Sequence, residues 1–164
     1  MTQFSVTKNG KKLSKKLYFW DESTKTFSSN ENNLVLDFSN ISGVTFNTGY
    51  NCTFKTGSDC SFNTGSDCCF KTGNNCCFKT GYNCTFDTED YCTFNTGSDC
   101  TFKTKSSCTF DTGDNCCFTT GEQCVVVRRD VYEIYELIKG IKYVLNEYRI
   151  PGLKNKEEIF EGLL

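Results

Sequence analysis

The sequence contains no histidine, and among its 164 residues it has only one proline, one methionine and one tryptophan. The absence of histidine excludes cysteine–histidine catalytic dyads and metal sites that combine the two side chains. No apolar stretch approaches the roughly 20 residues that a membrane-spanning helix needs. The net charge of −2 does not attract the protein to nucleic acid or to an anionic membrane. We therefore expect neither nucleic acid nor a membrane as a partner.

Cysteine, by contrast, is abundant, and all 13 cysteines lie between Cys52 and Cys124. An odd number of cysteines cannot pair completely within one chain. The first residues, Met1 to Phe4, contain no basic segment followed by an apolar one, so a secretory signal is not expected. Thiols are reduced in a cytoplasm, so the dense cysteines indicate packing rather than redox chemistry.

An eight-residue unit, Cys-x-Phe-x-Thr-Gly-x-Asn/Asp, repeats without insertion or deletion from about residue 36 to residue 131. We number its positions 1 to 8, so that Cys52 is at position 1 and Asp59 at position 8. Positions 1, 3 and 5 alternate with polar positions 2 and 4, which is typical of a half-buried strand. Glycine at position 6 tolerates positive φ, and Asn or Asp at position 8 favours a turn. Each unit therefore predicts a five-residue strand and a three-residue corner.

The inward positions predict a repeated core, in which phenylalanine rings stack and free cysteines pack as small apolar side chains. The predicted core ladder consists of Cys52, Cys60, Cys68, Cys76, Cys84, Cys92, Cys100, Cys108, Cys116, Phe54, Phe62, Phe70, Phe78, Phe86, Phe94, Phe102, Phe110 and Phe118.

A single strand cannot bury its inner face, so the units must stack as a parallel β-solenoid. Two units would give a flattened 16-residue coil, and three would give a triangular 24-residue coil. Glu89 and Lys105 replace the position-6 glycine and are 16 residues apart, so a two-unit coil stacks them as an opposite-charge pair. Asp87 would lie between two lysines at the same spacing. We predict an all-β fold, a parallel β-solenoid of about six coils with two octapeptides per coil.

The flanking segments predict caps. Residues 1–35 form an N-terminal cap with a β-hairpin at Asn9-Gly10, residues 36–131 form the solenoid, and residues 132–164 form a C-terminal capping or assembly segment. The lysines at 11, 12, 15 and 16 either belong to a solvated loop or contact an acidic partner.

The C-terminal segment predicts a small β/α tail, because Asn155 and Glu158 have the spacing of a capping box. Its apolar residues either fold onto the end of the solenoid or pack against another copy of the chain. The candidate assembly residues are Ile159, Phe160, Leu163 and Leu164.

The repeat offers little chemistry. Metal sites need clustered thiolates, but the cysteines recur at a spacing of eight, and consecutive ones such as Cys68 and Cys69 face opposite sides of a strand. We therefore expect no metal or other cofactor. Equivalent cysteines on adjacent coils would lie within bridging distance, but in-register geometry strains a disulfide, so oxidation of the ladder is the alternative and not the expectation.

Calcium binding, ice binding and catalysis are not expected either. Calcium at the corners would need charge that the many asparagines do not supply, so stacked Asx hydrogen bonds are expected instead. Ice binding would need a flat threonine array, which Lys, Asn and Asp at position 4 interrupt. The sequence has no phosphate-binding loop, nucleophile elbow or distinctive carboxylate pair, so no catalytic residues are expected.

The repeat Cys-Thr-Phe-Lys/Asn/Asp-Thr-Gly-Ser/Tyr-Asp/Asn resembles octapeptide-repeat proteins encoded by tailed phages and large DNA viruses. Residues 5–10 and the segment 124–131 that ends the repeat are similar as well, and the resemblance covers roughly residues 4 to 137. It implies a viral or mobile-element origin, but it supplies no particular function. Because no secretory signal is expected, we predict a location in the host cytoplasm or the virion.

The leading hypothesis is a non-enzymatic structural protein, a rigid β-solenoid spacer that joins itself or another structural protein through its ends. The alternative is a binding module whose lateral Thr/Lys/Asn face recognises a glycan or a host protein. Mimicry of duplex DNA is a third hypothesis, against which the interspersed lysines and the small net charge argue.

Overall fold

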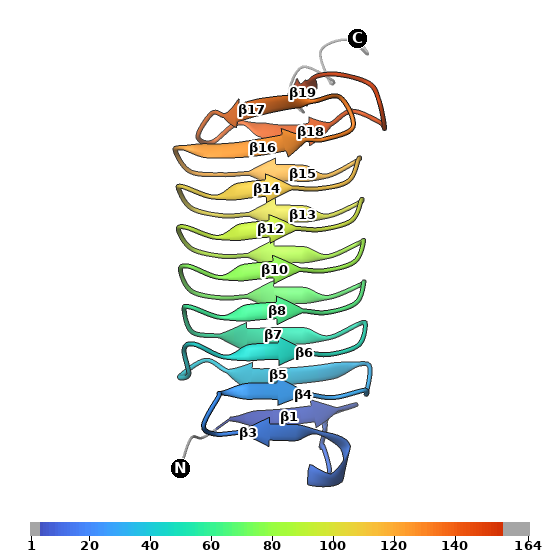
Figure 1. Cartoon of the computed structure of the whole chain (residues 1–164), viewed down its shortest axis with the longest axis vertical. Coiled ribbons are helices and arrows are strands. Elements are labelled where there is room, and N and C mark those ends of the chain that lie inside the picture. Colours follow the sequence, from blue (N-terminus) through green and yellow to red (C-terminus); the bar gives the residue numbers. More distant parts are fainter. Residues whose placement is uncertain (1–3, 156–164) are drawn as a thin grey trace.

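Short strands lie across the long axis of the molecule, one above another, from the N-terminal end to the C-terminal end (Figure 1). The computed structural model describes residues 4–155. The chain alternates between two sheets, so neighbouring strands within a sheet come from successive coils. The predicted parallel β-solenoid is therefore confirmed.

Sheet A has ten strands, in the spatial order β19 (Leu153–Asn155), β18 (Lys142–Leu145), β15 (Cys117–Thr119), β13 (Thr101–Lys103), β11 (Thr85–Asp87), β9 (Cys69–Lys71), β7 (Thr53–Thr56), β5 (Leu34–Phe38), β1 (Ser5–Lys8) and β2 (Lys11–Lys12). Sheet B has nine strands, in the order β17 (Glu133–Leu137), β16 (Cys124–Arg128), β14 (Thr109–Asp111), β12 (Thr93–Asn95), β10 (Cys77–Lys79), β8 (Ser61–Asn63), β6 (Thr45–Asn47), β4 (Thr26–Ser28) and β3 (Phe19–Asp21).

The register confirms the 16-residue coil. In sheet A, Phe86 pairs in parallel with Phe70 on one side and with Phe102 on the other. The same pairings place Asp87 between two lysines, as predicted. Glu89 and Lys105 form the predicted ion pair between adjacent coils.

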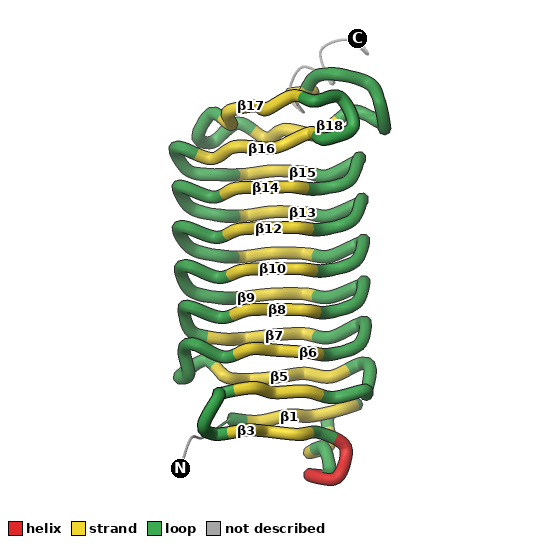
Figure 2. Tube along the Cα trace, in the orientation of Figure 1, coloured by secondary structure: helices red, strands yellow, loops and turns green. Residues whose placement is uncertain are grey.

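The strands are shorter than predicted. From β8 to β15 each strand is three residues long and covers positions 2 to 4, so that five-residue corners connect them (Figure 2). The inward positions 1 and 3 are nevertheless buried, as at Cys76 and Phe78, and the outward positions 2 and 4 are exposed, as at Cys77 and Lys79.

The predicted role of the position-6 glycine was wrong. Positive φ occurs at position 8, as at Asp59 (φ 60°) and Asn75 (φ 56°), where a short polar side chain tolerates the left-handed region. Glycine is needed at position 6 because the coils approach closely there. A Cβ on Gly97 would lie only 3.0 Å from the backbone nitrogen of Tyr82 in the preceding coil.

The corners are linked by the predicted ladders of Asx hydrogen bonds. Asn75 Nδ2 donates to Asp59 Oδ1 at 2.8 Å, and Asn83 Nδ2 donates to Asp67 Oδ1 at 2.7 Å. Each bond joins one coil to the next and pairs an amide donor with a carboxylate acceptor, which strengthens it. Asn and Asp at position 8 therefore both contribute to the hydrogen bonds that join the corners of successive coils.

Antiparallel strands close the stack at both ends. At the N-terminal end β1 and β2 form the predicted hairpin, β1 pairs with β5, and β3 pairs with β4. At the C-terminal end β17 covers β16 and β18 covers β15. These strands end the parallel stack within the chain, and β2, β3, β17 and β19 are the edge strands of the two sheets.

The described residues contain one short helical element, the 3-10 helix η1 (Lys15–Leu17), beside the N-terminal hairpin. Among residues 4–155, no helix has the length and apolar character that crossing a membrane requires. The predicted tail helix lies in residues 156–164, outside the described residues, and Asn155 ends β19.

Candidate functional site at the ends of the solenoid

The structure places the whole predicted core ladder inside the solenoid. Its cysteines and phenylalanines are all buried, with at most 3% of any side chain exposed. Phe rings of the same sheet stack in parallel, and rings of opposite sheets meet edge to face, as Phe78 does with Phe94 at 4.8 Å and with Phe86 at 5.1 Å. The ladder is a packing element of the core.

The buried thiols bond to the corners and to one another. Cys68 Sγ donates to the carbonyl oxygen of Ser66 at 3.4 Å and accepts from the backbone N–H of Cys52 at 3.4 Å. Contact with the thiols of Cys52 and Cys84 raises the pKa of Cys68, and burial raises it further. All 13 cysteines are free in the structure, and ten of them are buried.

Alkylation of the native, reduced protein is expected to label Cys69 and Cys77 first, because these two side chains are exposed. Cys117 is half-buried and should react more slowly, and the ten buried cysteines should react only after unfolding. Timed exposure to iodoacetamide at neutral pH, followed by peptide mass spectrometry, measures this order. The protein in guanidinium chloride is the reference, and fast native labelling of Cys84 would contradict a packing role.

The two lateral faces differ in charge. On sheet B, position 4 is mostly uncharged, as at Asn63 and Asn95, whereas on sheet A it carries charges such as Lys71 and Asp87. Sheet B carries a shallow hollow of about 250 Å³ over Phe62 and Phe78, and a hollow of about 380 Å³ beside Asn47 and Asn63.

Exposed apolar side chains concentrate at the C-terminal end. Among the described residues, five of the eleven large apolar side chains that are exposed lie between residues 132 and 150. They are Tyr132, Ile134, Ile138, Tyr148 and Ile150. Ile134 is 71% exposed on β17, the last strand of sheet B. This end therefore presents more exposed large apolar side chains than the strands of the lateral faces, among which Val35 on β5 is 44% exposed.

The N-terminal end carries a groove of about 530 Å³, which we call the N-terminal groove. It is lined by Phe4, Lys12, Lys15, Tyr18, Phe19, Trp20 and Glu22. Phe19 is 61% exposed, so its ring is available for contact. Phe4 anchors the groove to the core, because its ring stacks on Phe38 at 4.3 Å and lies 5.1 Å from Trp20.

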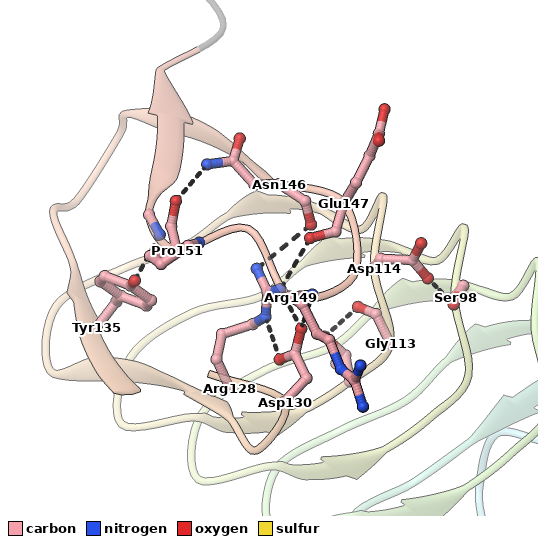
Figure 3. A network of polar contacts seen from close by, with 12 residues as sticks. Ser98, Gly113, Asp114, Arg128, Asp130, Tyr135, Asn146, Glu147, Arg149 and Pro151 are labelled. Atoms are coloured by element: carbon pink, nitrogen blue, oxygen red, sulfur yellow. Dashed lines mark hydrogen bonds and ion pairs between the residues drawn. The ribbon is translucent and has the colours of Figure 1, made fainter. Parts of the chain in front are cut away.

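A polar network holds the C-terminal cap in place (Figure 3). The guanidinium of Arg128 is only 1% exposed and donates from Nε and Nη2 to the two carboxylate oxygens of Asp130, at 2.8 and 2.6 Å. It also donates to the carbonyl oxygens of Asn146 and Glu147, both at 3.3 Å. Hydrogen bonding from Arg128 holds the pKa of Asp130 well below its usual range.

Asp130 connects this ion pair to the chain that crosses the end of the rod. Its carboxylate accepts from the backbone N–H of Arg149 at 2.8 Å. Nearby, Tyr135 accepts from the N–H of Gly152 at 2.6 Å, and Asn146 donates to the carbonyl of Pro151 at 2.7 Å (Figure 3). The loop between β18 and β19 is therefore fixed against β16 and β17.

Arg128 was not predicted from the sequence, although a signal was present. Arg128 occupies position 5 of the last unit, an inward position that is threonine in the regular repeats. An arginine there must be buried, and a buried charge needs a partner. The predicted assembly residues Ile159, Phe160, Leu163 and Leu164 lie outside the described residues.

Comparisons of the chain with protein-family models, curated proteins and solved structures find no match. Within residues 4–155, no group of three or more cysteine, aspartate or glutamate side chains is placed to hold a metal ion. The two ends are the surfaces of the rod that depart most from the regular pattern.

Proposed function

We propose that this protein is a non-enzymatic structural spacer, a rigid rod of viral origin that associates with copies of itself through its ends. The observation that carries the proposal is the concentration of exposed apolar side chains at the C-terminal end. The similarity of the repeat to octapeptide-repeat proteins of phages and large DNA viruses supports a virion-associated role in the host cytoplasm or the particle.

The coils support the rigidity that a spacer needs. Each coil is joined to the next by backbone hydrogen bonds in both sheets and at the corners, such as Gly81 N to Gly65 O at 3.3 Å and Thr80 N to Asn95 O at 3.1 Å. The continuous column of phenylalanine rings adds packing contact at every step. A rod with such a repeated core resists bending at any single coil.

Light scattering coupled to gel filtration tests the association. In reducing buffer, the mass of the full-length protein is expected to exceed the 18.6 kDa of one chain and to rise with concentration. Replacing Ile134 and Ile138 by lysine should lower that mass, because each lysine puts a charge into the apolar contact. The matched control replaces Tyr82 and Tyr91, which are exposed on the corners, by lysine.

Two results would contradict the proposal. A wild-type protein that is monomeric at all concentrations has no end-to-end contact. An equal loss of mass in the corner control would indicate association through the sides of the rod and not through its ends.

The alternative, a binding module for a glycan or host protein, has one supporting observation. The sheet B face is extended and mostly uncharged, with Thr93, Asn63 and Asn95 in regular rows that suit a repetitive polar ligand. A monomeric protein would favour this second function, since such a face needs no assembly.

A further inference from the structure

We propose that the C-terminal segment 156–164 of one copy binds the N-terminal groove of the next copy, which joins the rods head to tail. This inference rests on the proposed end-to-end association and names the contact through which it occurs. It depends on three features: the chemistry of the groove, the chemistry of the segment and the length of the rod.

The N-terminal groove is basic and aromatic. Lys12 and Lys15 line it beside the rings of Phe19 and Trp20, and both lysines are exposed; Glu22 is the one acidic residue of the lining. Lys11 and Lys16 adjoin them in the chain. None of these four lysines forms an ion pair with the residues that the structure describes. The N-terminal 35 residues contain six lysines and three acidic residues, so this end of the rod attracts a negative partner.

The segment 156–164, Lys-Glu-Glu-Ile-Phe-Glu-Gly-Leu-Leu, has the complementary chemistry. It carries three glutamates against one lysine, and four of its nine residues are large apolar ones. Its glutamates can pair with the lysines of the groove, while Phe160 and its apolar neighbours can cover the exposed ring of Phe19. Ion pairs give such a contact its orientation, and apolar burial supplies most of its affinity.

The length of the rod requires that the contact forms between different copies. The segment follows β19, the end strand of sheet A. The groove is lined by residues of β2, η1 and β3, and β3 lies at the opposite end of the rod from β19 (Figure 1). Ten strands at about 4.8 Å spacing extend over about 43 Å. Nine fully extended residues reach at most about 32 Å. The segment therefore cannot reach the groove of its own chain.

A contact between opposite ends of a rod is heterologous, and it leaves one free groove and one free segment at the ends of every assembly. Further copies can add to both ends. The expected product is an open chain of rods whose length rises with concentration and falls with added salt, because screening weakens the ion pairs.

A charge exchange in the full-length protein tests the contact by light scattering at low salt. Lys12→Glu with Lys15→Glu should weaken association by about tenfold or more, because like charges then face each other. Glu157→Lys with Glu158→Lys and Glu161→Lys should do the same. An equimolar mixture of the two variants should regain assembly, because each altered groove then meets a segment of opposite charge. Lys71→Glu with Lys79→Glu, on the lateral faces, is the matched control and should assemble like the wild type.

The outcomes separate this inference from the proposed function. If the wild type is monomeric, both are overturned. If the wild type assembles and the groove variant assembles equally well, or if the mixture fails to regain assembly, the rods associate through another contact and only this inference is overturned. Far-UV circular dichroism of each variant, with Lys12→Gln and Lys15→Gln as a milder pair, shows that a loss of assembly does not come from unfolding.

Discussion

Replacement of Phe78 by alanine is expected to lower the free energy of unfolding by about 3–5 kcal/mol, the usual loss when a buried phenylalanine is truncated. The Phe78 ring is 3% exposed and contacts four other phenylalanine rings. It stacks on Phe62 and Phe94 at 4.8 Å each, and it meets Phe70 edge to face at 5.3 Å. No neighbour can fill the space without leaving its own stack, so the cavity should persist.

Urea unfolding at equilibrium measures this loss. Tyr82→Ala is the matched control, because it removes an aromatic side chain of similar size that is 59% exposed on a corner, and it should change stability by about 0.5 kcal/mol or less. The loss of stability for Phe78→Leu should lie between the losses for Phe78→Ala and Tyr82→Ala. A loss below about 1 kcal/mol for Phe78→Ala would mean that the stack closes around the gap and that position 3 contributes far less than its burial indicates.

The solenoid could be predicted from the sequence because its contacts repeat. A fixed period in the chain becomes a fixed rise in space, so one exception to the pattern reports the register of the whole stack. Glu89 and Lys105 were such exceptions, and their ion pair confirms the 16-residue coil. The alternation of inward and outward positions was equally predictable, since it follows from the pleat of a strand.

The corner geometry could not be predicted from residue types alone. Glycine permits positive φ, but it also permits close approach of two backbones, and the sequence does not distinguish these two needs. At Gly97 the need is close approach, and at Asp99 a polar side chain takes the left-handed conformation. The C-terminal cap was unpredictable for another reason. Arg128 contacts Asn146 and Glu147, which are 18 and 19 residues away in a loop that lies outside the repeat.

Breaking the Arg128–Asp130 ion pair of the C-terminal cap is also expected to cause a large loss of stability. Arg128→Ala is expected to lower the free energy of unfolding by about 3 kcal/mol, the lower end of the loss on breaking a buried ion pair, because 15% of the Asp130 side chain remains exposed. The substitution leaves the Asp130 carboxylate without its bidentate partner and leaves the carbonyls of Asn146 and Glu147 without a donor. Arg129→Ala is the matched control. Arg129 also pairs with an aspartate, Asp111, but its side chain is 78% exposed, so the loss should be about 1 kcal/mol or less.

The pH dependence of unfolding distinguishes the ion pair from simple loss of packing. Hydrogen bonding from Arg128 lowers the pKa of Asp130 in the folded state, so the folded protein binds fewer protons than the unfolded chain between the two pKa values. The stabilisation is therefore complete above the unfolded value of about 3.9 and is lost as the pH falls toward the lower folded value. The difference in stability between the wild type and Arg128→Ala should be constant from pH 7 to about pH 5 and should shrink below about pH 4. Because Asp21 and Asp37, whose pKa values are also lowered, are present in both proteins, their contributions cancel in this difference. A difference that stays the same down to pH 2 would show that Arg128 acts through packing and not through its charge.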